Sequence, residues 1–102
     1  MSTAANAVID EPGNERFVYV EDGVEAQLVY RTRPGELILV HTEVPEALGG
    51  RGIAGRLVRA AADRAKASGE TVLPWCPYAR RWLEDHGDVA AGFTIDWSDP
   101  PR

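Results

Sequence analysis

The feature that most constrains the fold is a strand, a glycine-rich turn and a helix that follow one another between residues 36 and 68. Residues 36–44 (ELILVHTEV) contain an unbroken apolar run from Leu37 to Val40, which predicts a central strand covered on both faces. Residues 53–68 carry apolar and charged side chains on opposite faces of a helix, and residues 71–75 (TVLPW) predict another strand. Because a right-handed crossover makes such strands parallel, both end at one edge of the sheet.

The other segments predict an antiparallel meander before this unit and a second helix after it. Residues 16–20 and 24–30 favour strands, and Asp22-Gly23 between them favours a hairpin turn. A short strand is expected over residues 7–10 and a last one over residues 92–97. Pro77 and Gly87 are placed to start and to end the second helix. We therefore expect an α/β (α+β) fold: a mixed, mainly antiparallel twisted sheet with a central strand–helix–strand crossover and a second C-terminal helix.

Length and composition indicate one small domain. The chain has 102 residues, of which 44% are hydrophobic and 26% charged, as in ordinary globular proteins. Residues 1–14 are small, polar and interrupted by Pro12 and Gly13, so we expect a flexible N-terminal arm there. We expect the domain to span residues 15–97, followed by a tail over residues 98–102.

Charge and residue usage exclude several classes of function. The net charge of −5 disfavours nucleic acid as a partner, because binding to phosphates needs a basic surface. No apolar run is long enough to span a bilayer, and the N-terminus lacks the pattern of a secretory signal, so no membrane partner is expected. One cysteine and two histidines make a metal site improbable. The single Cys76 also favours a reducing, cytoplasmic location.

A cluster of glycines separates the central strand from its helix. Gly49, Gly50 and Gly52 stand in this turn, and Gly55 follows in the first helical turn, where glycine costs about 1 kcal/mol relative to alanine. A turn alone needs fewer glycines. Bare backbone N–H groups at a helix N-terminus bind anions, and Arg51 adds a positive charge. The pattern therefore predicts a phosphate or pyrophosphate site.

Two well-known phosphate motifs fit less well. The Walker pattern needs lysine and then serine or threonine after its last glycine, whereas Ile53 and Ala54 follow Gly52 here. Residues 50–55 (GRGIAG) match the dinucleotide pattern G-x-G-x-x-G literally. The dinucleotide-binding fold, however, needs an acidic residue at the end of the next strand, and residues 74–76 (PWC) supply none.

The better match is to the Gcn5-related N-acetyltransferases. Residues 49–54 (GGRGIA) resemble their coenzyme A loop, [Q/R]-x-x-G-x-[G/A], although Gly49 replaces the first polar residue. Three segments in order, HTEV, GRGIA and CP, resemble the small single-domain branch of that superfamily over residues 16–87. The resemblance implies acetyl-CoA or coenzyme A as the cofactor. It assigns the loop residues to the diphosphate, and places pantetheine contacts near Thr42 and Val44. Cys76, which the crossover brings near the expected thioester, is a further candidate contact with the cofactor. The loop residues are Gly49, Gly50, Arg51, Gly52, Ile53 and Ala54.

Glu43 and His41 are candidate catalytic residues at the end of the central strand. Strand alternation places them on one face, and Thr42 and Val44 on the other. Glu43 could take a proton from the attacking amine, directly or through water, if burial raises its pKa. It could equally be a solvated strand end. His41 is either a proton relay or a packed partner.

Cys76 and Tyr78 are candidates beside the leaving thiolate. Pro77 fits the first helical position, which puts Cys76 at the N-cap, where the helix dipole favours a thiolate. Cys76 could form an acetyl-cysteine, protonate the departing thiolate, or only pack against the cofactor. Tyr78 is the alternative acid, because many superfamily members use a tyrosine in this helix.

These inferences predict transfer of an acetyl group from acetyl-CoA to an amine, on a small molecule or on a protein or peptide. The alternative is a module that binds coenzyme A or acyl-CoA with little catalysis and acts through a protein partner. The expected partners are acetyl-CoA and an amine acceptor, and the protein is expected to be a monomer or weak homodimer. A scaffold without a ligand would leave the glycine cluster unexplained.

Overall fold

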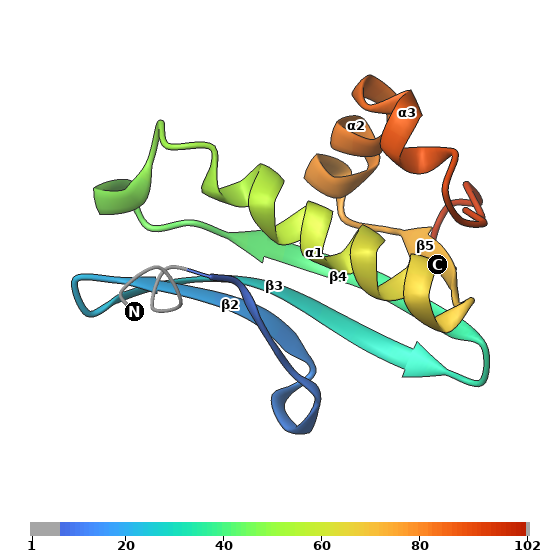
Figure 1. The fold of residues 1–102 in the computed structure, drawn as a ribbon, viewed down its shortest axis with the longest axis horizontal. Coiled ribbons are helices and arrows are strands. Elements are labelled where there is room, and N and C mark those ends of the chain that lie inside the picture. The colour runs from blue at the N-terminus through green and yellow to red at the C-terminus, as the bar shows by residue number, and fades with distance from the viewer. Residues whose placement is uncertain (1–6, 102) are drawn as a thin grey trace.

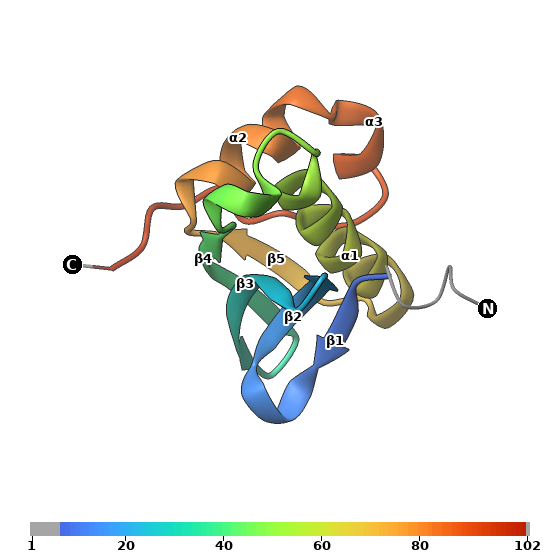
Figure 2. The same ribbon diagram turned by 90° about the vertical axis from the view of Figure 1, so that its left-hand side faces the viewer.

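In the computed structural model, which describes residues 7–101, a five-stranded sheet carries its helices on one side (Figures 1 and 2). The strand order follows the sequence; the first four strands are antiparallel, and the last pair is parallel. The strands are β1 (Ile9–Glu11), β2 (Arg16–Glu21), β3 (Val24–Arg33), β4 (Glu36–Glu43) and β5 (Thr71–Pro74). The mixed sheet and its central crossover confirm the predicted fold class.

Three α-helices and two short 3-10 helices complete the described chain. The α-helices are α1 (Ile53–Ser68), α2 (Pro77–Asp85) and α3 (Gly87–Ala90), and the 3-10 helices are η2 (Pro12–Asn14) and η3 (Glu46–Leu48). Helix α1 spans the predicted residues. It ends at Gly69, whose φ of 81° lets its N–H donate to the carbonyl oxygen of Ala65 at 2.8 Å.

One apolar core lies between the helices and the facing side of the sheet. Helix α1 contributes Ile53, Leu57, Val58, Ala61 and Ala65 to it, as the 3.6-residue period predicts. Helix α2 adds Ala79 and Leu83 to the same cluster. The strands supply alternate residues, among them Phe17, Leu28, Tyr30, Leu37, Leu39 and Val72. Burying each large side chain contributes about 1.5–3 kcal/mol, so α1 is held mainly by this face.

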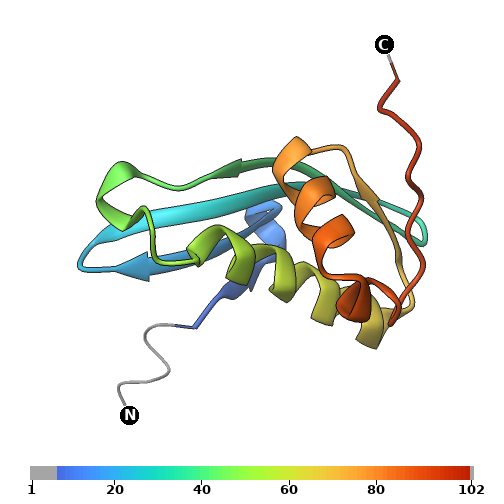
Figure 3. The ribbon, with the colours of Figure 1, turned by 90° about the horizontal axis from the view of Figure 1, so that it is seen from above.

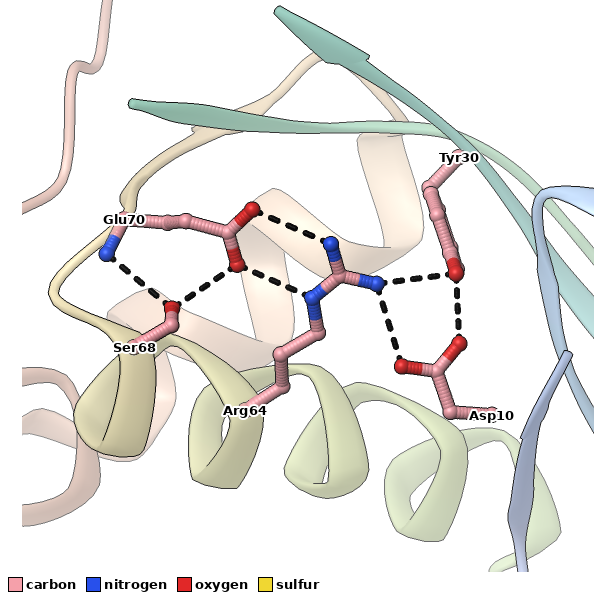
Figure 4. A network of polar contacts seen from close by, with 5 residues as sticks. All are labelled: Asp10, Tyr30, Arg64, Ser68 and Glu70. Atoms are coloured by element: carbon pink, nitrogen blue, oxygen red, sulfur yellow. Dashed lines mark hydrogen bonds and ion pairs between the residues drawn. The ribbon is translucent and has the colours of Figure 1, made fainter. Parts of the chain in front are cut away.

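A polar network at the N-terminal edge of the sheet fastens β1 to α1 (Figure 4). The Arg64 guanidinium donates to both carboxylate oxygens of Glu70, at 2.9 and 3.0 Å, and to the Tyr30 hydroxyl at 2.8 Å. That hydroxyl donates to Asp10 at 2.5 Å, and Arg64 also bonds Asp10 at 3.0 Å. Ser68 donates to Glu70 at 2.8 Å. Burial, with Asp10 as the second cause, raises the pKa of Tyr30 to about 12.

A short strand lies within the segment expected to be an N-terminal arm. Strand β1 pairs with β2, so residues 9–11 belong to the sheet, close to the strand expected over residues 7–10. The Asp10 carboxylate fastens this strand, because it accepts bonds from Tyr30 and Arg64. Residues 1–6 of that arm and residue 102 of the tail lie outside the described residues.

The predictions for residues 87 and 92–97 are wrong. Gly87 begins α3 instead of ending α2. A strand does not form over residues 92–97, where Ile95 makes a single parallel bridge to Val72. Beyond that bridge, the Asp96 carboxylate accepts bonds from both the N–H and the hydroxyl of Ser98. Such a local turn competes with a strand ladder.

Candidate functional site

The turn between β4 and α1 leaves backbone N–H groups without a protein acceptor at the helix N-terminus. Gly50 and Gly52 have φ values of 77° and 71°, which are strained for other residues, and Gly52 is the N-cap of α1. Within residues 7–101, the N–H groups from Gly50 to Gly55 donate to no protein acceptor. These donors, together with the helix dipole, fit the anion-binding role that the glycine pattern predicts.

Arg51 is the charged side chain of this turn, and it pairs with a carboxylate that the sequence did not suggest. Its Nη1 contacts Oε2 of Glu21, at the end of β2. The Tyr19 hydroxyl donates to the other oxygen of Glu21 at 2.6 Å. This bond, together with Arg51, holds the pKa of Glu21 below its usual value. Sequence reasoning missed Glu21 because it lies 30 positions before Arg51, and only the geometry of the hairpin brings the two side chains together.

An unpaired strand edge lies beside the turn. Strand β5 pairs with β4 only from Glu36 to Leu39, and the Cys76 N–H then donates to the Leu39 carbonyl at 2.8 Å. From Val40 to Glu43, no strand of the described chain lies on that side of β4. The strands therefore part earlier than Pro45, the residue from which the sequence predicted the divergence.

Thr42 and Cys76 meet at this edge, on the side of the helices. The Thr42 hydroxyl lies 3.1 Å from the Cys76 sulfur. Thr42 pairs with the core residue Leu28 across the sheet, which fixes its face. Cys76 is the N-cap of α2 and Pro77 its first residue, as predicted, and the cysteine is 4% exposed. The crossover therefore brings the ends of β4 and β5 together as the topology predicts.

Glu43 and His41 lie on the other face of β4. Glu43 accepts a bond from Gln27, its cross-strand partner, at 2.8 Å, and His41 Nε2 is 3.8 Å from a Glu43 oxygen. The side chains of His41 and Glu43 are 60% and 61% exposed. The structure thus separates them from Cys76 by strand alternation, and Glu43 lacks the burial that the base hypothesis invoked. Their catalytic roles stay predictions.

Tyr78 and Trp82 project from α2. Tyr78 is 42% exposed. Partial burial, and secondarily the electrostatic effect of Cys76, raises the pKa of Tyr78, whose phenol is protonated at neutral pH even at the ordinary value of about 10. Trp82 packs against Gly55, where an added Cβ would lie 2.7 Å from its indole nitrogen. Gly55 therefore has a packing reason in addition to its place in the glycine pattern.

Two surface hollows lie elsewhere. One of about 160 Å³ lies between α1 and residues 88–93, and one of about 300 Å³ lies between α1 and residues 7–8. Neither includes the glycine turn, β4 or Cys76, so the site is defined by backbone donors and a strand edge. Residues 7–101 contain no cluster of three potential metal ligands and no helix long and apolar enough to cross a membrane.

The comparison with protein families agrees with this arrangement. Residues 16–91 match the family model described as GCN5-related N-acetyl-transferase. The chain belongs to this family. The match covers β2 to α3 and therefore both parallel strands, the glycine turn and Cys76. No curated protein is similar enough in sequence to count as a match. Family membership supports acetyl transfer as the general activity.

Proposed function

We propose that this acetyltransferase moves an acetyl group from acetyl-CoA to an amine at the edge of β4 beside the glycine turn. The observation that carries the proposal is the row of unpaired N–H groups from Gly50 to Gly55, in a chain of this family. The residues present fit a diphosphate, because these amides have no protein acceptor, residues 50–52 are exposed, and the Arg51 side chain is half-exposed. We assign Gly49, Gly50, Arg51, Gly52, Ile53 and Ala54 to its binding.

The adjoining edge of β4 is suited to the pantetheine arm. The residues from Val40 to Glu43 have no strand on the β5 side, which leaves backbone groups open to a ligand's amides. We assign Thr42 and Val44 to this contact, and Cys76 to the wall of the site through its contact with Thr42.

In the proposed reaction the amine nitrogen attacks the thioester carbonyl carbon. A C–N bond forms, the C–S bond breaks, and the thiolate of coenzyme A leaves. Glu43 accepts the proton that the amine loses, with His41 as its neighbour. Tyr78, a phenol that is protonated at neutral pH, or Cys76 donates a proton to the thiolate. Positioning and backbone polarisation supply most of the rate.

A module that binds coenzyme A with little catalysis is the second candidate. The exposure of Glu43, on the face away from Cys76, favours it. In that case a protein partner would complete the site. We further propose that the protein is a monomer or weak homodimer and that it acts in the cytoplasm, where its single thiol stays reduced.

Calorimetry with acetyl-CoA tests the shared part of both candidates. Micromolar binding is expected, and the absence of binding would refute both. Release of free thiol with a panel of amines and peptides then separates them, since only the enzyme turns over.

The Glu43→Gln variant tests the proposed base. We expect turnover to fall about 10²–10⁴-fold, with acetyl-CoA affinity unchanged, because general base catalysis contributes roughly that factor. Glu36→Gln is the matched control, since Glu36 lies on the same strand but pairs with Arg33, far along β4. Equal turnover in the two variants would rule out the role of Glu43.

A further inference from the structure

We propose that Glu21 competes with the cofactor's diphosphate for Arg51, so that the hairpin between β2 and β3 sets the affinity of the glycine turn. This inference rests on the proposed function. The turn and the hairpin lie at the same end of the molecule in two perpendicular views (Figures 1 and 3). Their contact is the ion pair between Arg51 and Glu21.

Glu21 is held in place from both sides. Its Oε1 accepts the Tyr19 hydroxyl at 2.6 Å, and its Oε2 contacts Arg51. Tyr19 is itself buried, and the Arg56 guanidinium lies 4.8 Å from the centre of its ring. Glu21 therefore keeps a fixed place when Arg51 moves, because Tyr19 still donates to it.

Arg51 can leave this pair at small cost. Its side chain is 50% exposed and that of Glu21 is 25% exposed. Ion pairs between partly exposed side chains contribute little to stability, whereas a guanidinium binds a phosphate through two parallel hydrogen bonds. A diphosphate at the open amides thus offers Arg51 a stronger partner than Glu21 does.

The carboxylate weakens anion binding in two ways. It neutralises the one positive side chain of the turn before the ligand arrives, and it stays close as a like charge afterwards. Gln at this position keeps an acceptor for Tyr19 but removes the charge. Removing the competition should therefore tighten binding without loosening the hairpin.

Binding of acetyl-CoA to the full chain, measured by calorimetry, tests the inference. Glu21→Gln should lower the Kd by about three- to fivefold, as expected for relief of one partly exposed charge contact. Dephospho-coenzyme A, which keeps the diphosphate but lacks the 3′-phosphate, should show the same gain. Glu25→Gln, on the same hairpin but paired with Arg16, is the matched control and should bind as the wild type does.

A double-mutant cycle identifies the route of the effect. In the Arg51→Gln background, Glu21→Gln should give a clearly smaller gain than in the wild type, because only the like-charge repulsion is then relieved and no ion pair with Arg51 is left to break. An unchanged or raised Kd in Glu21→Gln, or the same gain without Arg51, would overturn the competition while leaving the proposed function intact. No binding by the wild type and Glu21→Gln would overturn both. Thermal unfolding of each variant confirms that the fold is retained.

Discussion

Replacing Gly55 by alanine sets two effects of known size against each other. Alanine in a helix is favoured over glycine by about 1 kcal/mol. The new Cβ, however, would lie 2.7 Å from Nε1 and 3.4 Å from Cδ1 of Trp82. Overpacking of this kind costs about 1–3 kcal/mol. The net expectation is a loss of about 0–2 kcal/mol in the free energy of unfolding, opposite in sign to the propensity effect.

The size of this loss in the free energy of unfolding depends on how far the Trp82 side chain can move away from the new Cβ. Its ring stacks on His86 with centroids 3.8 Å apart and planes 12° apart. His86 is fixed in turn, because its Nδ1 lies 2.7 Å from the Trp82 carbonyl oxygen. The stacked His86 therefore restricts the movement of the indole. A few tenths of an ångström of movement would disturb the contact between α1 and α2.

Denaturant unfolding of Gly55→Ala, followed by circular dichroism, measures this difference. In the Trp82→Leu background, the same substitution should become neutral or stabilising, because the indole nitrogen is gone. Ala54→Gly, one residue earlier, reports propensity at this end of α1 and should cost about 1 kcal/mol. Stabilisation of the wild-type background by Gly55→Ala would show that the contact with Trp82 does not explain this glycine.

Three other perturbations probe the fold and the site. Arg64, and secondarily Ser68, holds the pKa of Glu70 below its usual value, so the Glu70 carboxylate stabilises the fold above its unfolded pKa of about 4.3, and this stability is lost as pH falls through the folded pKa. In Glu70→Gln, the free energy of unfolding should therefore fall less steeply with decreasing pH in the acid range than in the wild type. The same steepness in both proteins would contradict this. Glu15 has a φ of 50°, a left-handed conformation that glycine adopts more easily than other residues. Glu15→Gly should therefore raise the free energy of unfolding by up to about 1 kcal/mol, and Glu15→Ala should not. Equal denaturation midpoints for the two variants would show that the backbone at residue 15 is not strained. Tyr78→Phe should lower turnover at least about tenfold with acetyl-CoA affinity kept. Because burial raises the pKa of Tyr78, the alkaline loss of wild-type turnover that comes from ionisation of this phenol should begin above the usual pKa of tyrosine, about 10. Full activity in Tyr78→Phe would exclude the phenol as the acid.

Local rules predicted the elements that position the site. The apolar period and Gly69 predict α1 to the residue, and Pro77 predicts the N-cap position of Cys76. The parallel pairing of β4 with β5 follows from the crossover alone. Each of these depends on residues near in sequence or on a topological rule with few exceptions.

Contacts between distant segments could not be predicted in the same way. The pair of Glu21 with Arg51 depends on hairpin length and sheet twist, and no sequence spacing reveals it. Gly55 looked like part of the anion site because the tryptophan that packs against it lies in another helix. Alternation correctly separated Glu43 from Thr42, but the sequence could not say which of the two would face the helices.

That separation restricts where the proposed chemistry can occur. Thr42 and Cys76 lie on the helix side of β4, and Glu43 lies on the other side. A thioester on either face would reach only one of these groups. A thioester along the unpaired edge beyond Leu39 would lie between them, since successive side chains of one strand flank its edge from opposite faces. No helix of the described chain covers the face that carries Glu43 (Figure 2). An amine would therefore approach from that open face and pass Glu43 first, while the thiolate departs toward the N-terminus of α2.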